Sequence, residues 1–401
     1  MERKKPDLCS LVDGATYRDG NPFDTWRWLR ENEPVAWQNG GEFGDFWSVT
    51  RHADVDRVLR DPDTFSSSSG ILLRPQAMGA DPGGNRTLAL SDAPRHGVLR
   101  KAVSSWFAPR NLRSLAESLT AMAREDVAAA VRRRDVDFVA DVAAKLPVEV
   151  AWIFLGIPEK DRPALTRWSL AAFCSDSAVE RTVAHLEILD YFHTLADARR
   201  ARPADDLVSV LSRVEVDGRL LPLDEVVLNC DNLLVGSTEN VRLAMAGGVQ
   251  ALLDRASLWQ RVRREPDRLM PTLVEEMLRW TSSATHLVRT ARRDVELGGQ
   301  RIGAGQRVVL WLPSANRDPI AFDAPEVFDV ARSPNRHIAL GAGPHYCLGV
   351  QLARLEIQAV VAELIRSVGR LQANGEPERL ESIVVNGYRT LPIRLEAEEI
   401  L

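Results

Sequence analysis

The chain has few cysteines and lacks long hydrophobic runs. Its four cysteines, Cys9, Cys174, Cys230 and Cys347, are scattered along 401 residues, which argues against a disulfide scaffold and suits a reducing compartment. No run of about 18 apolar residues, the length that favours a transmembrane helix, occurs in the sequence. The segment from Met1 to Asp7 is basic but has no apolar stretch typical of a signal peptide. We therefore expect a cytoplasmic protein with no membrane partner.

The chain also lacks a strong charge of either sign. Its net charge is −5, so nothing in the composition points to a nucleic-acid partner. The sequence contains no repeat, low-complexity tail or linker, and its hydrophobic fraction of 45% is ordinary for a globular protein. We therefore interpret residues 1–401 as a single domain, and we expect a monomer.

A short loop near the C-terminal end carries one of the cysteines. Residues 340–349 read LGAGPHYCLG, and their glycines and proline predict a tight loop that no regular element could hold. Apolar residues at helical spacing begin at Leu348. Cys347 is therefore expected at the start of a helix, where free amides and the helix dipole favour a thiolate, a good metal ligand. A buried structural cysteine is the alternative; a zinc site is weaker, because no second Cys or His pair has zinc spacing.

One long helical pattern covers residues from Asp224 to Asp254, roughly 45 Å at about 1.5 Å per residue. Its middle, residues 236–240, reads GSTEN between apolar neighbours. Gly, Ser, Thr and Asn are poor in a helix interior. The pattern indicates a locally weakened helix with a widened groove that holds a ligand, although a simple kink or a packing glycine would give the same pattern.

Two charged pairs lie on predicted helices. His96 and Arg100 are four residues apart on a helix that begins near Ser91, so both project from one face and could hold an anion. A solvated basic surface is the alternative. Glu276 and Arg279 are three residues apart and also share a face, but such a pair is a weak motif by itself, and an exposed ion pair contributes little stability.

Other segments predict the remaining architecture. Strands are expected at residues 35–37 and 46–49, and an irregular segment rich in glycine and proline follows Ser66. Further strands are expected between residues 294 and 312, turned by two glycines. Residues from Phe173 to Ser177 are expected to form a loop between two helices.

Taken in order, these motifs resemble those of the cytochrome P450 family, over essentially the full length of the chain. The family's cysteine loop has the pattern Phe-Gly-x-Gly-x-His-x-Cys-x-Gly. The sequence matches it at all fixed positions except Leu340, where the family usually has Phe; the matches are Gly341, Gly343, His345, Cys347 and Gly349. The resemblance implies a mainly α fold with small antiparallel β-sheets, in which haem b lies between the long central helix and the helix after the cysteine loop.

The resemblance also implies roles for the residues around the haem. Cys347 would be the proximal iron ligand, and the loop positions Leu340 and Gly349 would border the cofactor. The haem propionates would be bound by His96, Arg100, Arg289 and His345. Behind the haem, Glu276 and Arg279 would form a structural network with Arg332, which lies in a segment resembling the family's meander.

On the central helix, the best register places Glu239 at the family's acidic position and Asn240 at its usual threonine, although a shift of one residue is open. The family's threonine hydroxyl orders water for proton delivery. An amide can still form hydrogen bonds to water or substrate, but it cannot rotate a hydroxyl proton. Expected substrate contacts are residues near the haem edge and along the central helix: Leu88, Leu233, Val235, Gly236, Thr285, His286 and Val385.

The implied activity is that of a monooxygenase which inserts oxygen from O2 into a small hydrophobic organic molecule, in secondary-metabolite biosynthesis. No flavin or iron–sulfur motif is present, so electrons would come from a ferredoxin and its reductase. A basic set near the proximal side would suit such an acidic partner: Arg95, Arg100, Lys101, Arg110 and Arg113. Two alternatives stay open, namely oxidative cyclisation or coupling without net oxygen insertion, and a catalytically idle haem-fold adaptor.

Overall fold

A computed structural model describes residues 5–174 and 177–398. The loop expected from Phe173 to Ser177 includes residues 175 and 176, which lie outside the described residues; helix α7 continues through Cys174. Among the described residues, no helix is long and apolar enough to cross a lipid bilayer. The fold is mainly α with small β-sheets, as the sequence predicts.

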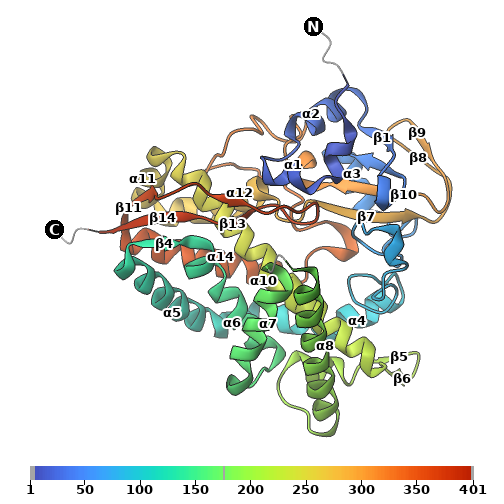
Figure 1. Cartoon of the computed structure of the whole chain (residues 1–401), viewed down its shortest axis with the longest axis horizontal. Coiled ribbons are helices and arrows are strands. Elements are labelled where there is room, and N and C mark those ends of the chain that lie inside the picture. Colours follow the sequence, from blue (N-terminus) through green and yellow to red (C-terminus); the bar gives the residue numbers. More distant parts are fainter. Residues whose placement is uncertain (1–4, 175–176, 399–401) are drawn as a thin grey trace.

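Helices form most of the molecule and are drawn in Figure 1. Their bounds are α1 Gly14–Arg18, α2 Phe23–Asn32, α3 His52–Arg60, α4 Arg95–Ser104, α5 Pro109–Arg133, α6 Lys145–Leu155, α7 Arg162–Cys174, α8 Ala178–Ala201, α9 Leu207–Leu211, α10 Leu223–Leu253, α11 Ala256–Arg264, α12 Pro266–Thr281, α13 Leu312–Ala315 and α14 Val350–Ser367. Helix α10 runs through the middle of the helical body and packs against α6, α8, α12 and α14. The largest hydrophobic core surrounds it.

The strands of the largest sheet lie beside α1 to α3, whereas β4, β11 and β14 lie beside α5 and α14 (Figure 1). Their bounds are β1 Val35–Gln38, β2 Phe46–Val49, β3 Phe65–Ser66, β4 Asp135–Asp137, β5 Glu215–Val216, β6 Arg219–Leu220, β7 His286–Ala291, β8 Val295–Leu297, β9 Gln300–Ile302, β10 Arg307–Trp311, β11 Val368–Ala373, β12 Glu378–Arg379, β13 Tyr388–Thr390 and β14 Pro392–Ala397. The largest sheet has the order β1-β2-β10-β7-β3. Its pairs are antiparallel except β2 with β10, which is parallel.

Helix α10 is helical throughout its 31 residues, so the local weakening expected near Gly236 does not appear. The polar residues there find a partner inside the helix: the hydroxyls of Ser237 and Thr238 both donate to the Leu234 carbonyl, at 3.0 Å. Further along, a Cβ at Gly247 or Gly248 would overlap side chains of α12. These two glycines therefore allow α10 and α12 to pack closely behind the cavity described below.

Candidate functional site: a cavity with a cysteine and four cationic side chains

A cavity of about 310 Å³ lies between α10 and the loop that carries Cys347. Its walls come from segments far apart in the sequence, including α4, α6, α10, β7 and the start of α14. The Cys347 side chain lines this cavity together with the polar residues His96, Arg100, Arg289 and His345. Most other lining residues are apolar, with a few polar side chains among them, including Asn232, Ser237 and Asn240.

The loop from Leu340 to Gly349 holds Cys347 in place through backbone contacts. The Cys347 N–H donates to the Leu340 carbonyl at 2.9 Å. Gly341 and Gly343 have φ values of 72° and 67°, a region that favours glycine. At Gly343, a Cβ would also overlap the backbone at the end of α3. The glycine spacing read from the sequence therefore reflects a turn that needs positive φ values and packs closely against α3.

Helix α14 begins at Val350, three residues after Cys347, and its N-cap is Gly349. The expectation that Cys347 itself starts the helix was therefore wrong. Burial raises the pKa of the Cys347 thiol, although the Gly349 N–H, Arg100 and Arg354 act in the opposite direction. The surrounding chain alone therefore does not favour a thiolate, whereas a cation bound at the sulfur would, because metal ligation deprotonates a thiol.

The side chains of His96, Arg100, Arg289 and His345 form what we call the cationic cradle. Arg289 is 3% exposed, and burial lowers its pKa to about 10. Burial, followed by the charge of Arg289, lowers the pKa of His345 to about 3. The two histidine rings lie 4.1 Å apart between centroids. The pKa of His96 is lowered as well, by burial and then by Arg100, so the uncharged form of both rings is favoured, although Asp92 acts in the opposite direction. An anion among these side chains would favour their charged forms.

No carboxylate of the described residues forms an ion pair with Arg100 or Arg289. Arg100 instead donates to the Tyr346 carbonyl at 2.6 Å, and Arg289 to the Val288 carbonyl at 2.8 Å. The buried Nε2 of His96 has no hydrogen-bond partner in the described part of the chain. These unused donors fit the two propionates of a haem whose iron lies at Cys347.

The structure separates the two residues expected to be catalytic. Asn240 lines the cavity, and its Oδ1 accepts a hydrogen bond from Ser283 Oγ at 3.0 Å. Glu239 does not line the cavity, and its carboxylate pairs with Arg242. Adjacent residues of a helix point in different directions, so the amide of Asn240 faces the cavity whereas the carboxylate of Glu239 faces Arg242.

The expected substrate contacts fall into two groups. Leu88, Leu233 and Gly236 line the cavity, as do the cofactor contacts Leu340 and Gly349, whereas Val235, Thr285, His286 and Val385 do not. Thr285 and Val385 belong to a backbone connection: the Thr285 N–H donates to the Val384 carbonyl at 3.0 Å, and Ala284 forms a β-bridge with Val385. Thr285 and Val385 therefore lie behind the residues that line the cavity and support them.

His286 is completely buried and joins two loops. Its Nε2 accepts from the Leu73 N–H at 2.9 Å, and its Nδ1 lies 3.0 Å from the Ile383 carbonyl. Both contacts are satisfied by one neutral tautomer, in which Nδ1 carries the proton. Burial lowers the pKa of His286 to about 4, so the ring holds two loops together as a neutral group instead of contacting a substrate.

Several wall residues were not predicted from the sequence. Helix α6 contributes Val150, Ala151, Phe154 and Leu155, and Phe107, Leu207 and Asn232 also face the cavity. The positions in α6 are apolar on both its buried and its cavity-facing sides, so the sequence pattern contains no sign that distinguishes a cavity wall from a packed core. Asn232 carries no such sign either, because it directly follows Asp231 and lies three residues after Asn229 in a polar part of α10.

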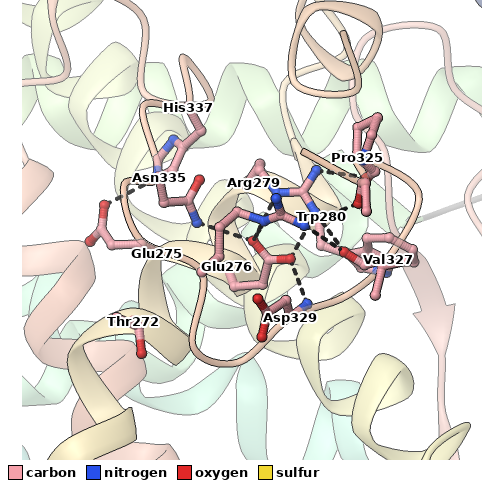
Figure 2. Close-up of polar contacts among 12 residues, drawn as sticks. Thr272, Glu275, Glu276, Arg279, Trp280, Pro325, Val327, Asp329, Asn335 and His337 are labelled. Carbon is pink, nitrogen blue, oxygen red and sulfur yellow. Dashed lines mark hydrogen bonds and ion pairs between the residues drawn. The ribbon is translucent and has the colours of Figure 1, made fainter. Parts of the chain in front are cut away.

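Glu276, Arg279 and Arg332 form a buried cluster, which we call the Glu276 network, shown in part in Figure 2. The two carboxylate oxygens of Glu276 accept from Arg279 at 2.7 and 2.8 Å, and Arg332 Nε lies 3.1 Å from Oε2. The Asp329 N–H and the Asn335 amide donate to the same carboxylate, at 2.8 and 3.1 Å. This arrangement anchors the segment after α13 to α12.

Comparisons with known proteins agree with this geometry. The family profile described as "Cytochrome P450" matches residues 180–368. Cytochrome P450 NovI of Streptomyces niveus is 38% identical over 98% of this chain and 97% of its own length. A steroid C26-monooxygenase of Mycolicibacterium smegmatis is 34% identical over 97% of this chain and 96% of its own.

A solved structure gives the same result for the fold. P450 OxyD, which is involved in the biosynthesis of vancomycin-type antibiotics, superposes with a TM-score of 0.88 at 35% identity. The match covers 98% of this chain and 100% of that one. Full-length identity of this size, together with a cysteine and a cationic cradle around one cavity, shows the relationship: this chain belongs to the cytochrome P450 family, and it is a haem b oxidoreductase.

Proposed function

We propose that the protein is a haem-thiolate monooxygenase that oxidises a small hydrophobic organic molecule with O2 in secondary-metabolite biosynthesis. The observation that carries this proposal is the position of Cys347 on the wall of a cavity that also contains the cationic cradle. A haem held there by a thiolate supplies the cleavage of the O–O bond. OxyD, which is involved in the biosynthesis of vancomycin-type antibiotics, supports a role in secondary metabolism by analogy.

The chain's own residues would bind the cofactor and the substrate. The cradle residues His96, Arg100, Arg289 and His345 would hold the propionates by charge-assisted hydrogen bonds. Leu88 and Leu233 belong to an apolar wall that excludes water and favours a hydrophobic substrate. Asn240, fixed by Ser283, would hold a water molecule or a substrate oxygen beside this wall.

Electrons would come from a ferredoxin, reduced by its own reductase, because the sequence has no flavin or iron–sulfur motif of its own. Arg95 is less suited to this contact than expected, since it forms an ion pair with Glu225, and Arg100 faces the Tyr346 carbonyl. Lys101, Arg110 and Arg113 are exposed on α4 and α5. These three residues are therefore the proposed contact for an acidic partner of a monomeric, cytoplasmic enzyme.

Replacing Cys347 tests the proposal directly. The wild-type protein, loaded with haem and reduced under carbon monoxide, should give a thiolate-type Soret band. Cys347→Ala should lose that band, because no other sulfur lines the cavity among the described residues. Cys9→Ala, at an exposed cysteine, is the matched control and should keep the band. Retention of the band in Cys347→Ala would overturn the assignment, and a wild-type protein that takes up no haem would indicate an adaptor.

Oxidative cyclisation or coupling is a second candidate, favoured by the amide of Asn240 at the cavity wall. Product mass separates the two, since monooxygenation adds one oxygen whereas coupling removes two hydrogens. We expect Asn240→Thr to change the fraction of electrons recovered in product, because a hydroxyl can donate its proton in directions that an amide cannot. Measured peroxide release per electron pair checks this, and Gln250→Thr, elsewhere on α10, should leave it unchanged.

A further inference from the structure

The α10 wall of the cavity carries two carboxamides with unused hydrogen-bonding groups. Asn232, Ser237 and Asn240 all line the cavity. Ser237 donates to the Leu234 carbonyl within the helix, and Oδ1 of Asn240 accepts from Ser283. The Nδ2 of Asn240 and the whole carboxamide of Asn232 have no partner within the described residues. Neither side chain is fully buried, so water can bind these groups until a ligand replaces it.

The two carboxamides are separated by an open stretch of the cavity. They are eight residues apart on α10, which corresponds to about 12 Å at about 1.5 Å per residue. Gly236 lies midway between them and also lines the cavity. A Cβ built at Gly236 would meet nothing within 4 Å. A single molecule can therefore extend past Gly236 and reach both amides.

Few of the described residues that line the cavity are charged or ionisable. The charged or ionisable lining residues are the four of the cationic cradle, together with Cys347 and Glu356. Glu356 is on α14, and burial raises the pKa of its carboxyl well above its ordinary value, which favours the uncharged form. A charged ligand beside Asn232 and Asn240 would therefore lose its hydration without gaining an opposite charge.

We propose that the substrate is an uncharged molecule with an apolar middle and two polar groups, and that Asn232 and Asn240 bind these two groups. This inference rests on the proposed function and adds the substrate class and a specificity-determining residue, Asn232. Asn240 offers a donor, because its Oδ1 is already occupied by Ser283. It therefore selects an acceptor such as a carbonyl or hydroxyl oxygen, whereas Asn232 can both donate and accept.

A series of linear probes tests the proposal on the haem-loaded protein. Terminal diols, the corresponding 1-alkanols and the corresponding fatty acids of increasing length would be titrated, with binding followed by the change in the haem absorption spectrum. We expect diols to bind more tightly than alkanols at the chain length that spans both amides, and fatty acids to bind most weakly. This preference follows because a site built to hydrogen-bond an oxygen discriminates against the analogue without it.

Asn232→Leu should weaken binding of the best diol by roughly three- to tenfold, the value of about one hydrogen bond. It should leave the alkanol of the same length unchanged or slightly tighter. Gln250→Leu removes an amide of α10 that donates to Asp254 outside the cavity, and this control should bind both probes as wild type does. If Asn232→Leu takes up no haem, Asn232→Ala replaces it in the same comparison.

Equal affinities of diols and alkanols at every length would overturn the inference, and so would an equal effect of Asn232→Leu on both probes. Tighter binding of the fatty acids than of the diols would also overturn it, since it would reveal a site for a charged ligand. Each of these results leaves the proposed monooxygenase standing as long as the thiolate-type Soret band is present. Loss of that band in the wild-type protein would overturn the proposed function itself.

Discussion

The Glu276 network and the cationic cradle both bury several arginine or histidine side chains, yet they differ in how the charges are balanced. In the network, the carboxylate of Glu276 accepts from Arg279 and Arg332, and all three residues are buried. In the cradle, Arg100 and Arg289 donate to backbone carbonyls and have no carboxylate partner among the described residues. The first cluster is complete within the chain, whereas the second needs an added anion.

The two clusters should therefore contribute to different properties: the Glu276 network to folding stability and the cationic cradle to cofactor binding. Removing the one carboxylate that two buried arginines share leaves both of them uncompensated, which is strongly destabilising. Removing one charge from an unbalanced cluster relieves repulsion and desolvation in the protein without haem, but it removes a donor for the haem propionates. The same kind of mutation should therefore have opposite effects on the haem-free protein at the two sites.

The largest effect is expected for Glu276→Gln. The substitution keeps the shape of the side chain but leaves Arg279 and Arg332 without a buried counter-charge, so unfolding free energy should fall by about 3–5 kcal/mol, with and without haem. Urea unfolding followed by circular dichroism measures this. Glu33→Gln, in the exposed ion pair with Lys5, is the control and should change stability by less than about 1 kcal/mol. A similarly small loss in Glu276→Gln would show that the network is not needed for stability.

Arg289→Met should have a smaller effect than Glu276→Gln, and it should not lower the stability of the haem-free protein. The haem-free protein should be as stable as wild type or more stable, because a buried unpaired charge is removed. Haem should be released faster, by roughly 30-fold, if one charge-assisted hydrogen bond of about 2 kcal/mol is lost. Transfer of haem to apomyoglobin measures the release rate. Destabilisation of the haem-free protein to the degree expected for Glu276→Gln would contradict the comparison.

His286 gives the smallest effect and sharpens the comparison, because it is buried without any charge. Its pKa is lowered from 6.5 to about 4 in the folded protein. Between these pH values the unfolded chain binds a proton that the folded one does not, so folding stability falls as pH falls. The change should be up to about 1.4 kcal/mol per pH unit, lost in full by about pH 4.

Urea unfolding of the haem-loaded protein at pH 7 and pH 5.5 measures this contribution. His286→Gln retains a carbonyl and an amide for the Leu73 and Ile383 contacts but has no group that titrates in this range. The variant should therefore show a flatter dependence of stability on pH than wild type. Identical slopes for the two proteins would mean that His286 binds its proton equally well in both states.

The sequence predicts the fold well, because the fold depends on local patterns. The glycine spacing around Cys347 reflects positive φ values at Gly341 and Gly343. The helical spacing of residues 224–254 corresponds to α10 at Leu223–Leu253. Similarly, Glu276 and Arg279 do share one face of α12, although only the structure adds Arg332, Asp329 and Asn335 to the same carboxylate.

The expected substrate contacts agree less well with the lining of the cavity, because this lining depends on how separate elements pack. Thr285 and His286 lie next to cavity residues in the sequence, but alternation along β7 and its approach turns them to other neighbours. The wall contributed by α6 has no special residue that would identify it, since an apolar side chain looks the same beside a cavity and inside a core. The bounds of helices are a third limit. The helix that follows Cys347 begins only at Val350, and a difference of a few residues from the expected start changes which amides lie near the sulfur.

Asn229 connects the end of the irregular segment to the central helix. On α10, its Oδ1 accepts from the Leu88 N–H at 2.8 Å, and its Nδ2 donates to the Arg86 carbonyl at 3.0 Å. The end of the irregular segment is thereby pinned to the helix that carries both ligand-binding amides. Leu88, which lines the cavity, is therefore fixed to α10, so this part of the wall should keep its shape when a ligand binds.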